Sequence, residues 1–117
     1  MAVKRIVANV AADAAGDVAA FYAELFDLEV AMDFGWIVTL VSGETATVQM
    51  SVASEGGSGT PVPDMSIEVD DVDAVHARAE ARGAEIVYAL TDEPWGVRRF
   101  YLRDPAGKLV NVLSHGD

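Results

Sequence analysis

The chain has 117 residues, the length of one compact domain, and its 51% apolar composition is too high for a disordered or fibrous protein. It contains no cysteine, which excludes a disulfide scaffold, thiol catalysis and thiolate metal ligands. Eight basic residues against nineteen acidic residues give a formal net charge of −11, which disfavours nucleic acid and membrane surfaces as partners.

The first half of the chain predicts one strand, one helix and three further strands. The first strand is expected over residues 5–10, and Asp13 offers a side-chain cap to the helix that follows it. Helical spacing gives this helix an apolar face of Val18, Phe21, Tyr22, Leu25 and Phe26. Short breaks, typical of hairpins, separate three strand candidates at residues 28–32, 36–41 and 46–52.

The second half repeats this order after residues 54–63, a connection rich in glycine and proline that we interpret as flexible. A strand is predicted over residues 65–69, followed by a helix that Asp71 caps and Gly83 ends. Three more strand candidates follow, at residues 85–90, 97–103 and 108–113.

The doubled order predicts an α+β fold made of two βαβββ modules within a single domain, residues 1–117. Module one covers about residues 4–53, the linker 54–63, and module two about residues 64–115. A four-stranded sheet with one helix leaves its second face uncovered. Two such modules can curve into one cup-shaped mixed sheet, and a second copy of the chain can cover the rest, so we expect a homodimer.

Three segments carry a resemblance to a known superfamily: FYAELFDLEV from Phe21, SIEVDDVDAV from Ser66 and FYLRDPAGKLVNVL from Phe100. In this order, over the doubled pattern, they resemble the vicinal oxygen chelate superfamily, which includes glyoxalases, extradiol dioxygenases and bleomycin resistance proteins. The stretch from Pro94 to Gly107 looks most like the bleomycin resistance branch.

The resemblance implies four positions at which the enzymes of this superfamily hold a divalent metal. Here these positions carry Val7 or Asn9, Gln49, Asp64 and Asn111. Only Asp64 offers an anionic oxygen, whereas a tight site normally uses three or more imidazole or carboxylate ligands. The sequence therefore predicts no metal site and no cofactor, and it leaves open whether the protein is an enzyme.

Polar residues alternate with apolar ones on two predicted strands, so Thr47, Gln49 and Ser51 share one face, as do Asp64, Ser66 and Glu68. By the resemblance both faces line the cup; otherwise they simply face water. Trp36 and Trp95 lie near turns, where each either packs locally or contacts a ligand. Acidic surface either keeps the protein soluble or captures a cation.

The best interpretation is a metal-independent protein that binds a small organic molecule, cationic or aromatic, and sequesters a bleomycin-like antibiotic. The candidate ligand-binding residues are Asp33, Phe34, Trp36, Gln49, Ser51, Asp64, Trp95 and Asn111. The alternative is a glyoxalase- or dioxygenase-like enzyme with an atypical metal site. No apolar run reaches the roughly 20 residues of a membrane span, and no signal peptide is evident, so we expect a cytoplasmic location.

We interpret the other charged and titratable residues as structural. The basic cluster of Arg98, Arg99, Arg103 and Lys108 is expected to form a salt-bridged surface, with contact to an anionic substrate as the alternative. His76 and His115 are expected to be ordinary solvated histidines outside the cleft strands. Asp92 and Glu93 are neighbouring loop carboxylates without the opposed geometry that acid–base catalysis needs.

Overall fold

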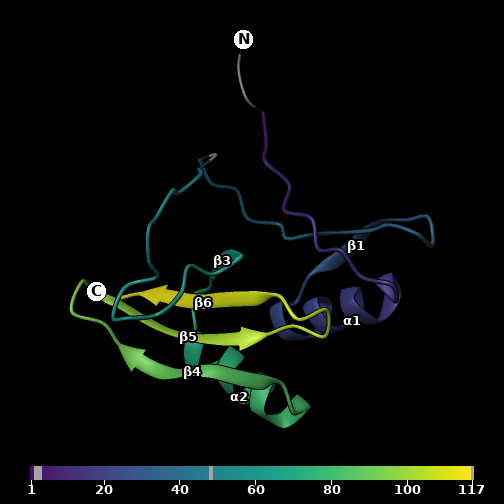
Figure 1. Ribbon diagram of the computed structural model, residues 1–117. Coiled ribbons are helices and arrows are strands. Elements are labelled where there is room, and N and C mark those ends of the chain that lie inside the picture. The colour runs from purple at the N-terminus through teal and green to yellow at the C-terminus, as the bar shows by residue number, and fades with distance from the viewer. Residues whose placement is uncertain (2–3, 48, 117) are drawn as a thin grey trace. The chain divides into compact units, whose positions relative to one another are not determined.

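The computed structural model describes residues 1, 4–47 and 49–116. The chain forms two compact units, Met1–Ser54 and Glu55–Asp117, with two helices and six strands assigned among the described residues (Figure 1). This is an α+β fold, as the sequence predicts. The grouping of the modules into a single domain with a linker stays a prediction.

The first unit contains helix α1 (Ala15–Phe26), whose buried side chains are Val18, Phe21, Tyr22 and Leu25. The predicted apolar face is therefore confirmed for these four residues. The predicted cap at Asp13 is wrong, because the helix begins one residue later and its N-cap is Ala14, which has no side-chain oxygen to offer.

Strands β1 (Glu29–Asp33) and β2 (Val38–Val41) form the predicted hairpin. The Asp33 carboxylate accepts a hydrogen bond from the Gly35 N–H at 2.9 Å, and the Phe34 N–H donates to the Ile37 carbonyl at 2.9 Å. Gly35 has a positive φ of 82°. A small residue is needed at such a position, because a side chain would be strained there.

The strands predicted at residues 5–10 and 46–52 are not formed in the described part of the first unit. Residue 48 lies outside the described residues. An apolar run becomes a strand only when its backbone finds a partner, and β1 and β2 form a two-stranded sheet. The large apolar side chains of these two segments are accordingly exposed: Ile6, Val7, Met50 and Val52.

The second unit has the complete βαβββ order that the sequence predicts. Its elements are β3 (Met65–Glu68), α2 (Val72–Arg82), β4 (Glu85–Asp92), β5 (Val97–Arg103) and β6 (Leu109–His115). They build a mixed sheet in the order β3-β6-β5-β4, in which β3 runs parallel to β6 and the other pairs are antiparallel. Neither α1 nor α2 has the length and apolarity that crossing a membrane requires.

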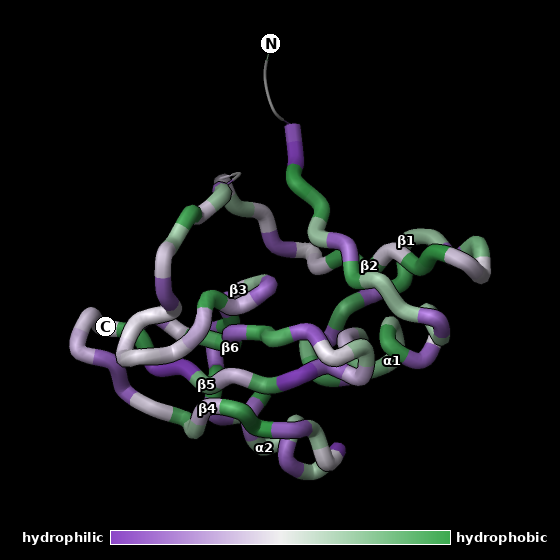
Figure 2. The backbone as a smooth tube through the Cα atoms, viewed as in Figure 1, coloured by the Kyte–Doolittle hydropathy of each residue, from purple (hydrophilic) through white to green (hydrophobic). Residues whose placement is uncertain are grey.

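Helix α2 covers one face of this sheet. Phe100, which is fully buried, meets the His76 ring edge-on at a centroid distance of 4.8 Å, and Arg98 bonds Asp73 on the helix. Since neighbouring residues of a strand point to opposite faces, Arg99 and Tyr101 point away from α2. Figure 2 shows hydrophilic and hydrophobic stretches following one another along β5 and β6.

The Asp71 cap of α2 is confirmed, since its carboxylate accepts a hydrogen bond from the Ala74 N–H at 3.1 Å. We expect Asp71→Ala to lower the free energy of unfolding by about 1 kcal/mol, because that N–H loses its partner. Urea denaturation measures the change. The adjacent Asp70→Ala variant is the matched control, and equal effects of the two would contradict the assignment.

The bond between Asp73 and Arg98 ties α2 to β5 and predicts a pH dependence. The Arg98 guanidinium, which donates to this carboxylate, holds the pKa of Asp73 below its ordinary value. The stabilisation that this ion pair contributes is therefore fully present above the unfolded pKa of Asp73, about 3.9. It is lost as the pH falls through the lower pKa of the folded state.

We expect wild-type protein to be more stable than Asp73→Asn at neutral pH, and the difference to disappear in strong acid. Urea midpoints between about pH 2 and pH 6 measure it, with Asp70→Asn as the control. A difference that persists unchanged at the lowest pH would contradict a stabilising role of the charged carboxylate.

Candidate functional site

One face of the second unit's sheet points away from α2 and is here named the polar face. Its polar and charged residues are Ser66, Glu68, Arg99, Tyr101, Arg103, Asn111 and His115, and the apolar residues Val97, Leu109 and Leu113 lie among them. The strand register brings these residues together, because Asn111 is the Cα partner of both Ser66 and Tyr101. This face is the candidate site within the second unit.

A buried ion pair between Arg99 and Glu93 lies at one end of the polar face. The guanidinium and the carboxylate approach to 2.7 Å, and their side chains are only 5% and 3% exposed. Glu93 also accepts hydrogen bonds from the Ser58 hydroxyl at 3.1 Å and the Tyr88 hydroxyl at 3.2 Å. Both carboxylate oxygens therefore have partners, which a buried charge requires.

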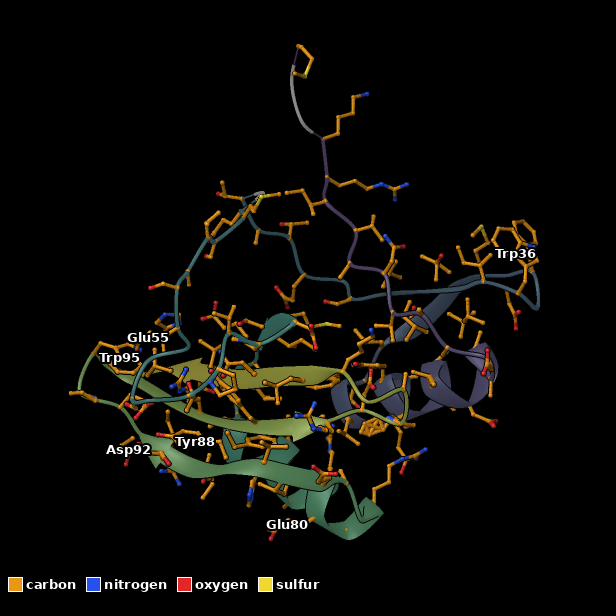
Figure 3. All side chains as sticks on the ribbon, in the orientation of Figure 1. Trp36, Glu55, Glu80, Tyr88, Asp92 and Trp95 are labelled. Carbon is orange, nitrogen blue, oxygen red and sulfur yellow. The ribbon has the colours of Figure 1, made fainter. Side chains whose placement is uncertain are left out.

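Three aromatic rings surround the Arg99 guanidinium. Its central carbon lies 5.3, 5.2 and 5.0 Å from the ring centroids of Tyr88, Trp95 and Tyr101. Each distance lies within the range of a cation–π attraction. Trp95 itself remains 51% exposed, at the turn between β4 and β5 (Figure 3).

The same guanidinium holds the segment Gly56–Pro61, here named the glycine loop. Arg99 donates to the carbonyl oxygens of Gly56 at 2.8 Å and Gly57 at 3.2 Å. The Tyr101 hydroxyl pairs with the Thr60 hydroxyl at 3.0 Å. A Cβ at Gly56 would collide with the Pro61 carbonyl and the Thr60 hydroxyl, so only glycine fits this approach.

The structure corrects one expectation here, because Arg99 is buried and does not belong to a salt-bridged surface. Glu93 lies in the turn after β4, where the sequence places it, and is buried as the partner of Arg99. Arg98 and Arg103 do form exposed ion pairs, with Asp73 and with Glu85. The alternation along β5 puts Arg99 and Tyr101 on the face opposite to Phe100, but it does not indicate which arginine is buried.

Asn111 lies in the middle of the polar face and is 8% exposed. Its side-chain N–H donates to the Ser66 hydroxyl at 3.1 Å, across the parallel pair β3 and β6. Its carbonyl oxygen Oδ1 is buried without a hydrogen-bond partner among the described residues. The sequence predicted Asn111 for the site but gave no indication of this unused acceptor.

Asp64 precedes β3 and bonds the backbone where β6 begins. Its carboxylate accepts a hydrogen bond from the Leu109 N–H at 2.8 Å, and its own N–H donates to the Leu109 carbonyl at 2.8 Å. One carboxylate oxygen therefore has a structural partner. This predicted site residue lies just before β3, the strand that pairs with the strand of Asn111.

The expectation that His115 lies outside the cleft strands is wrong. Residue 115 ends β6, and its Nδ1 lies 2.7 Å from the Glu68 carboxylate on the polar face. Both side chains are about 60% exposed, at 62% for His115 and 61% for Glu68. The strand continues two residues beyond the predicted end because its backbone pairs with β5 as far as Val97.

The remaining predicted residues belong to the first unit: Asp33, Phe34, Trp36, Gln49 and Ser51. Phe34 and Trp36 lie at the hairpin between β1 and β2 and are 65% and 79% exposed. Figure 3 shows Trp36 at this hairpin. Gln49 and Ser51 are exposed and lie outside the strands. Within its own unit, the structure brings together Asp33, Phe34 and Trp36 at one turn.

Comparison with known proteins identifies the family. The family model of the Glyoxalase/Bleomycin resistance protein/Dioxygenase superfamily matches residues 6–112. The chain belongs to this superfamily. No curated protein matches the chain.

Solved structures with similar folds carry different names. TioX from Micromonospora sp. ML1 is 25% identical, with a TM-score of 0.60 over 86% of this chain and 89% of that one. Lactoylglutathione lyase from Agrobacterium tumefaciens is 22% identical, with a TM-score of 0.64 over 97% and 92%. A superfamily member from Sphaerobacter thermophilus is 19% identical, with a TM-score of 0.64 over 98% of each chain.

The residues that the resemblance places at the superfamily's metal positions do not fit a divalent ion. In the second unit these positions carry Asp64, whose carboxylate bonds Leu109, and Asn111, a neutral amide. In the first unit they carry Gln49 and either Val7 or Asn9, which supply no charge. Among the described residues of the second unit, no three His, Asp or Glu side chains gather as ligands.

The buried ion pair makes a prediction about stability. We expect Arg99→Met to lower the free energy of unfolding by about 3–5 kcal/mol, because Glu93 is left charged and buried without its partner. Thermal and urea unfolding measure the change. The double variant with Glu93→Gln should cost less than the two single changes added together.

Arg103→Met is the matched control, since Arg103 lies on the same strand with an exposed ion pair. We expect it to change the free energy of unfolding by less than about 1 kcal/mol. Similar small effects at positions 99 and 103 would show that the buried pair does not hold the second unit together.

Proposed function

We propose that this protein is a metal-independent small-molecule binding protein of the superfamily, acting as a cytoplasmic homodimer. We further propose that its ligand is a bleomycin-like cationic antibiotic and that sequestration of the drug gives resistance. Binding alone keeps a drug from its target, so no bond needs to be made or broken.

One observation carries the proposal: neutral amides replace the charged ligands on which metal chemistry depends. Asn111 keeps the polar shape of a carboxylate but not its charge, and its hydrogen bond to Ser66 fixes it in place. An amide binds organic polar groups well and divalent cations weakly. This change of residue type favours recognition of an organic molecule over coordination of a metal.

Charge and aromatic surface support a cationic ligand. The formal net charge of −11 attracts cations over distances set by the salt concentration. Trp95 is half exposed and offers the uncovered part of its ring for stacking. Phe34 and Trp36 offer further aromatic surface on the first unit.

A second candidate function has one observation in its favour. Glu68 and His115, on the polar face, are the types of residue that hold metals in this class of site. They favour the alternative of a glyoxalase- or dioxygenase-like enzyme with an atypical metal site. Such a site would need further ligands, and Asp64, which precedes β3, is an acidic candidate.

Calorimetric titration separates the two functions. We expect metal-free bleomycin to bind the metal-stripped protein, and its affinity to fall strongly between about 0.01 M and 1 M salt, where the screening length shrinks from about 30 Å to about 3 Å. We expect nickel, zinc, manganese and ferrous ions not to bind at one ion per chain with micromolar affinity.

Trp95→Leu should weaken the binding of bleomycin, whereas Ala81→Leu, an exposed change on α2, should not. No bleomycin binding at low salt would overturn the drug proposal. Stoichiometric metal binding that is lost in Glu68→Gln or His115→Ala would establish the enzyme alternative instead.

A further inference from the structure

An unused acceptor on the polar face points to the chemistry of the ligand. Asn111 Oδ1 is the one buried side-chain atom of the described residues that has no hydrogen-bond partner. Buried carbonyl oxygens almost always accept a hydrogen bond, because an unpaired one loses its hydration without compensation. The packing of the sheet gives this atom no partner, and we take the unpaired oxygen as an indication that a bound ligand supplies one.

In the structure the donor side of the Asn111 amide faces its neighbour on β3. Ser66 and Asn111 are Cα partners on β3 and β6, and the Asn111 side-chain N–H donates to the Ser66 hydroxyl at 3.1 Å. This arrangement leaves Oδ1 without a hydrogen-bond partner among the described residues. Tyr101 is the Cα partner of Asn111 on the neighbouring strand β5.

Two arginines lie on the polar face, and both already have acidic partners. Arg99 is 4% exposed, its charge is paired with Glu93, and it also donates to carbonyl oxygens of the glycine loop. Arg103 pairs with Glu85 and donates to the Gly107 carbonyl. Glu68 adds a carboxylate to the same face. These contacts favour an incoming group that brings its own N–H donors.

We propose that Asn111 Oδ1 accepts a hydrogen bond from a cationic N–H group of the ligand, such as an amidinium, guanidinium or ammonium group. The inference rests on the proposed function and deepens it, since it names the part of the ligand that this residue recognises. An ionised carboxylate has no proton to donate at neutral pH and is rejected at this position.

Three small probes with the same ring test this directly: benzamidine, a cation with N–H donors; benzamide, a neutral amide; and benzoate, an anion without donors. We expect the side-chain amide resonance of Asn111 in nitrogen-15 NMR spectra to move most with benzamidine, less with benzamide and not with benzoate. This series needs no variant, so it does not depend on how well a variant folds.

Two substitutions then separate the acceptor from the rest of the side chain. Asn111→Leu should weaken benzamidine binding about 10-fold or more, because a hydrogen bond to a charged group is lost. Asn111→Asp keeps the acceptor and adds a charge, so it should bind benzamidine at least as tightly as the wild type. Ala81→Asp adds the same charge at an exposed position of α2 and should leave the affinity unchanged.

Each outcome decides the inference. It is overturned if benzoate moves the Asn111 resonance as far as benzamidine does, if Asn111→Leu binds benzamidine like the wild type, or if Asn111→Asp loses binding. No movement with any probe also overturns it. Movement with benzamidine together with no binding of bleomycin overturns the drug proposal and leaves the inference standing.

Discussion

The buried Arg99–Glu93 ion pair organises the polar face of the second unit. A buried charge is costly unless its partners are complete, and here they come from three separate segments. The turn between β4 and β5 supplies Glu93 and Trp95, β5 supplies Arg99 and Tyr101, and the glycine loop supplies carbonyl oxygens. The glycine loop, part of the connection that the sequence analysis interprets as flexible, is thereby hydrogen-bonded to the sheet, and Gly56 is needed for the close approach.

The alternation along β5 explains how much the sequence could predict. A period of two correctly places Arg98 with Phe100 and Arg99 with Tyr101 on opposite faces. Both faces carry arginine and one aromatic residue, so local composition cannot tell which arginine is buried. That depends on Glu93 and on carbonyl groups about forty residues earlier in the chain. Non-local partners also explain why helix α2 and its sheet form as predicted, while the described residues within 5–10 and 46–52 form no strand.

In the candidate site, too, the sequence predicts the identity of a residue but not its contacts. The identity of Asn111 was accessible from the sequence through its resemblance to the superfamily, because its position in the last strand is defined by a short motif. Its burial, its hydrogen bond to Ser66 and its unused oxygen arise from the pairing of β3 with β6, which joins residues 45 positions apart. His115 was missed because the length of β6 depends on its pairing with β5 and not on its own residues.

The aromatic rings around the Arg99 guanidinium limit how a cationic ligand can bind. Acidic and aromatic side chains suited to a cation are present, but Tyr88, Trp95, Tyr101 and Glu93 already surround the chain's own guanidinium. A cationic ligand therefore cannot use this cluster as a cage without displacing Arg99 from a buried ion pair, which costs several kcal/mol. The net charge of −11 acts at long range and raises the rate of encounter, whereas orientation has to come from short-range groups that are still free to bond. On the polar face Asn111 Oδ1 is such a group. Specificity therefore rests on this neutral amide, because the aromatic cluster already holds the Arg99 guanidinium.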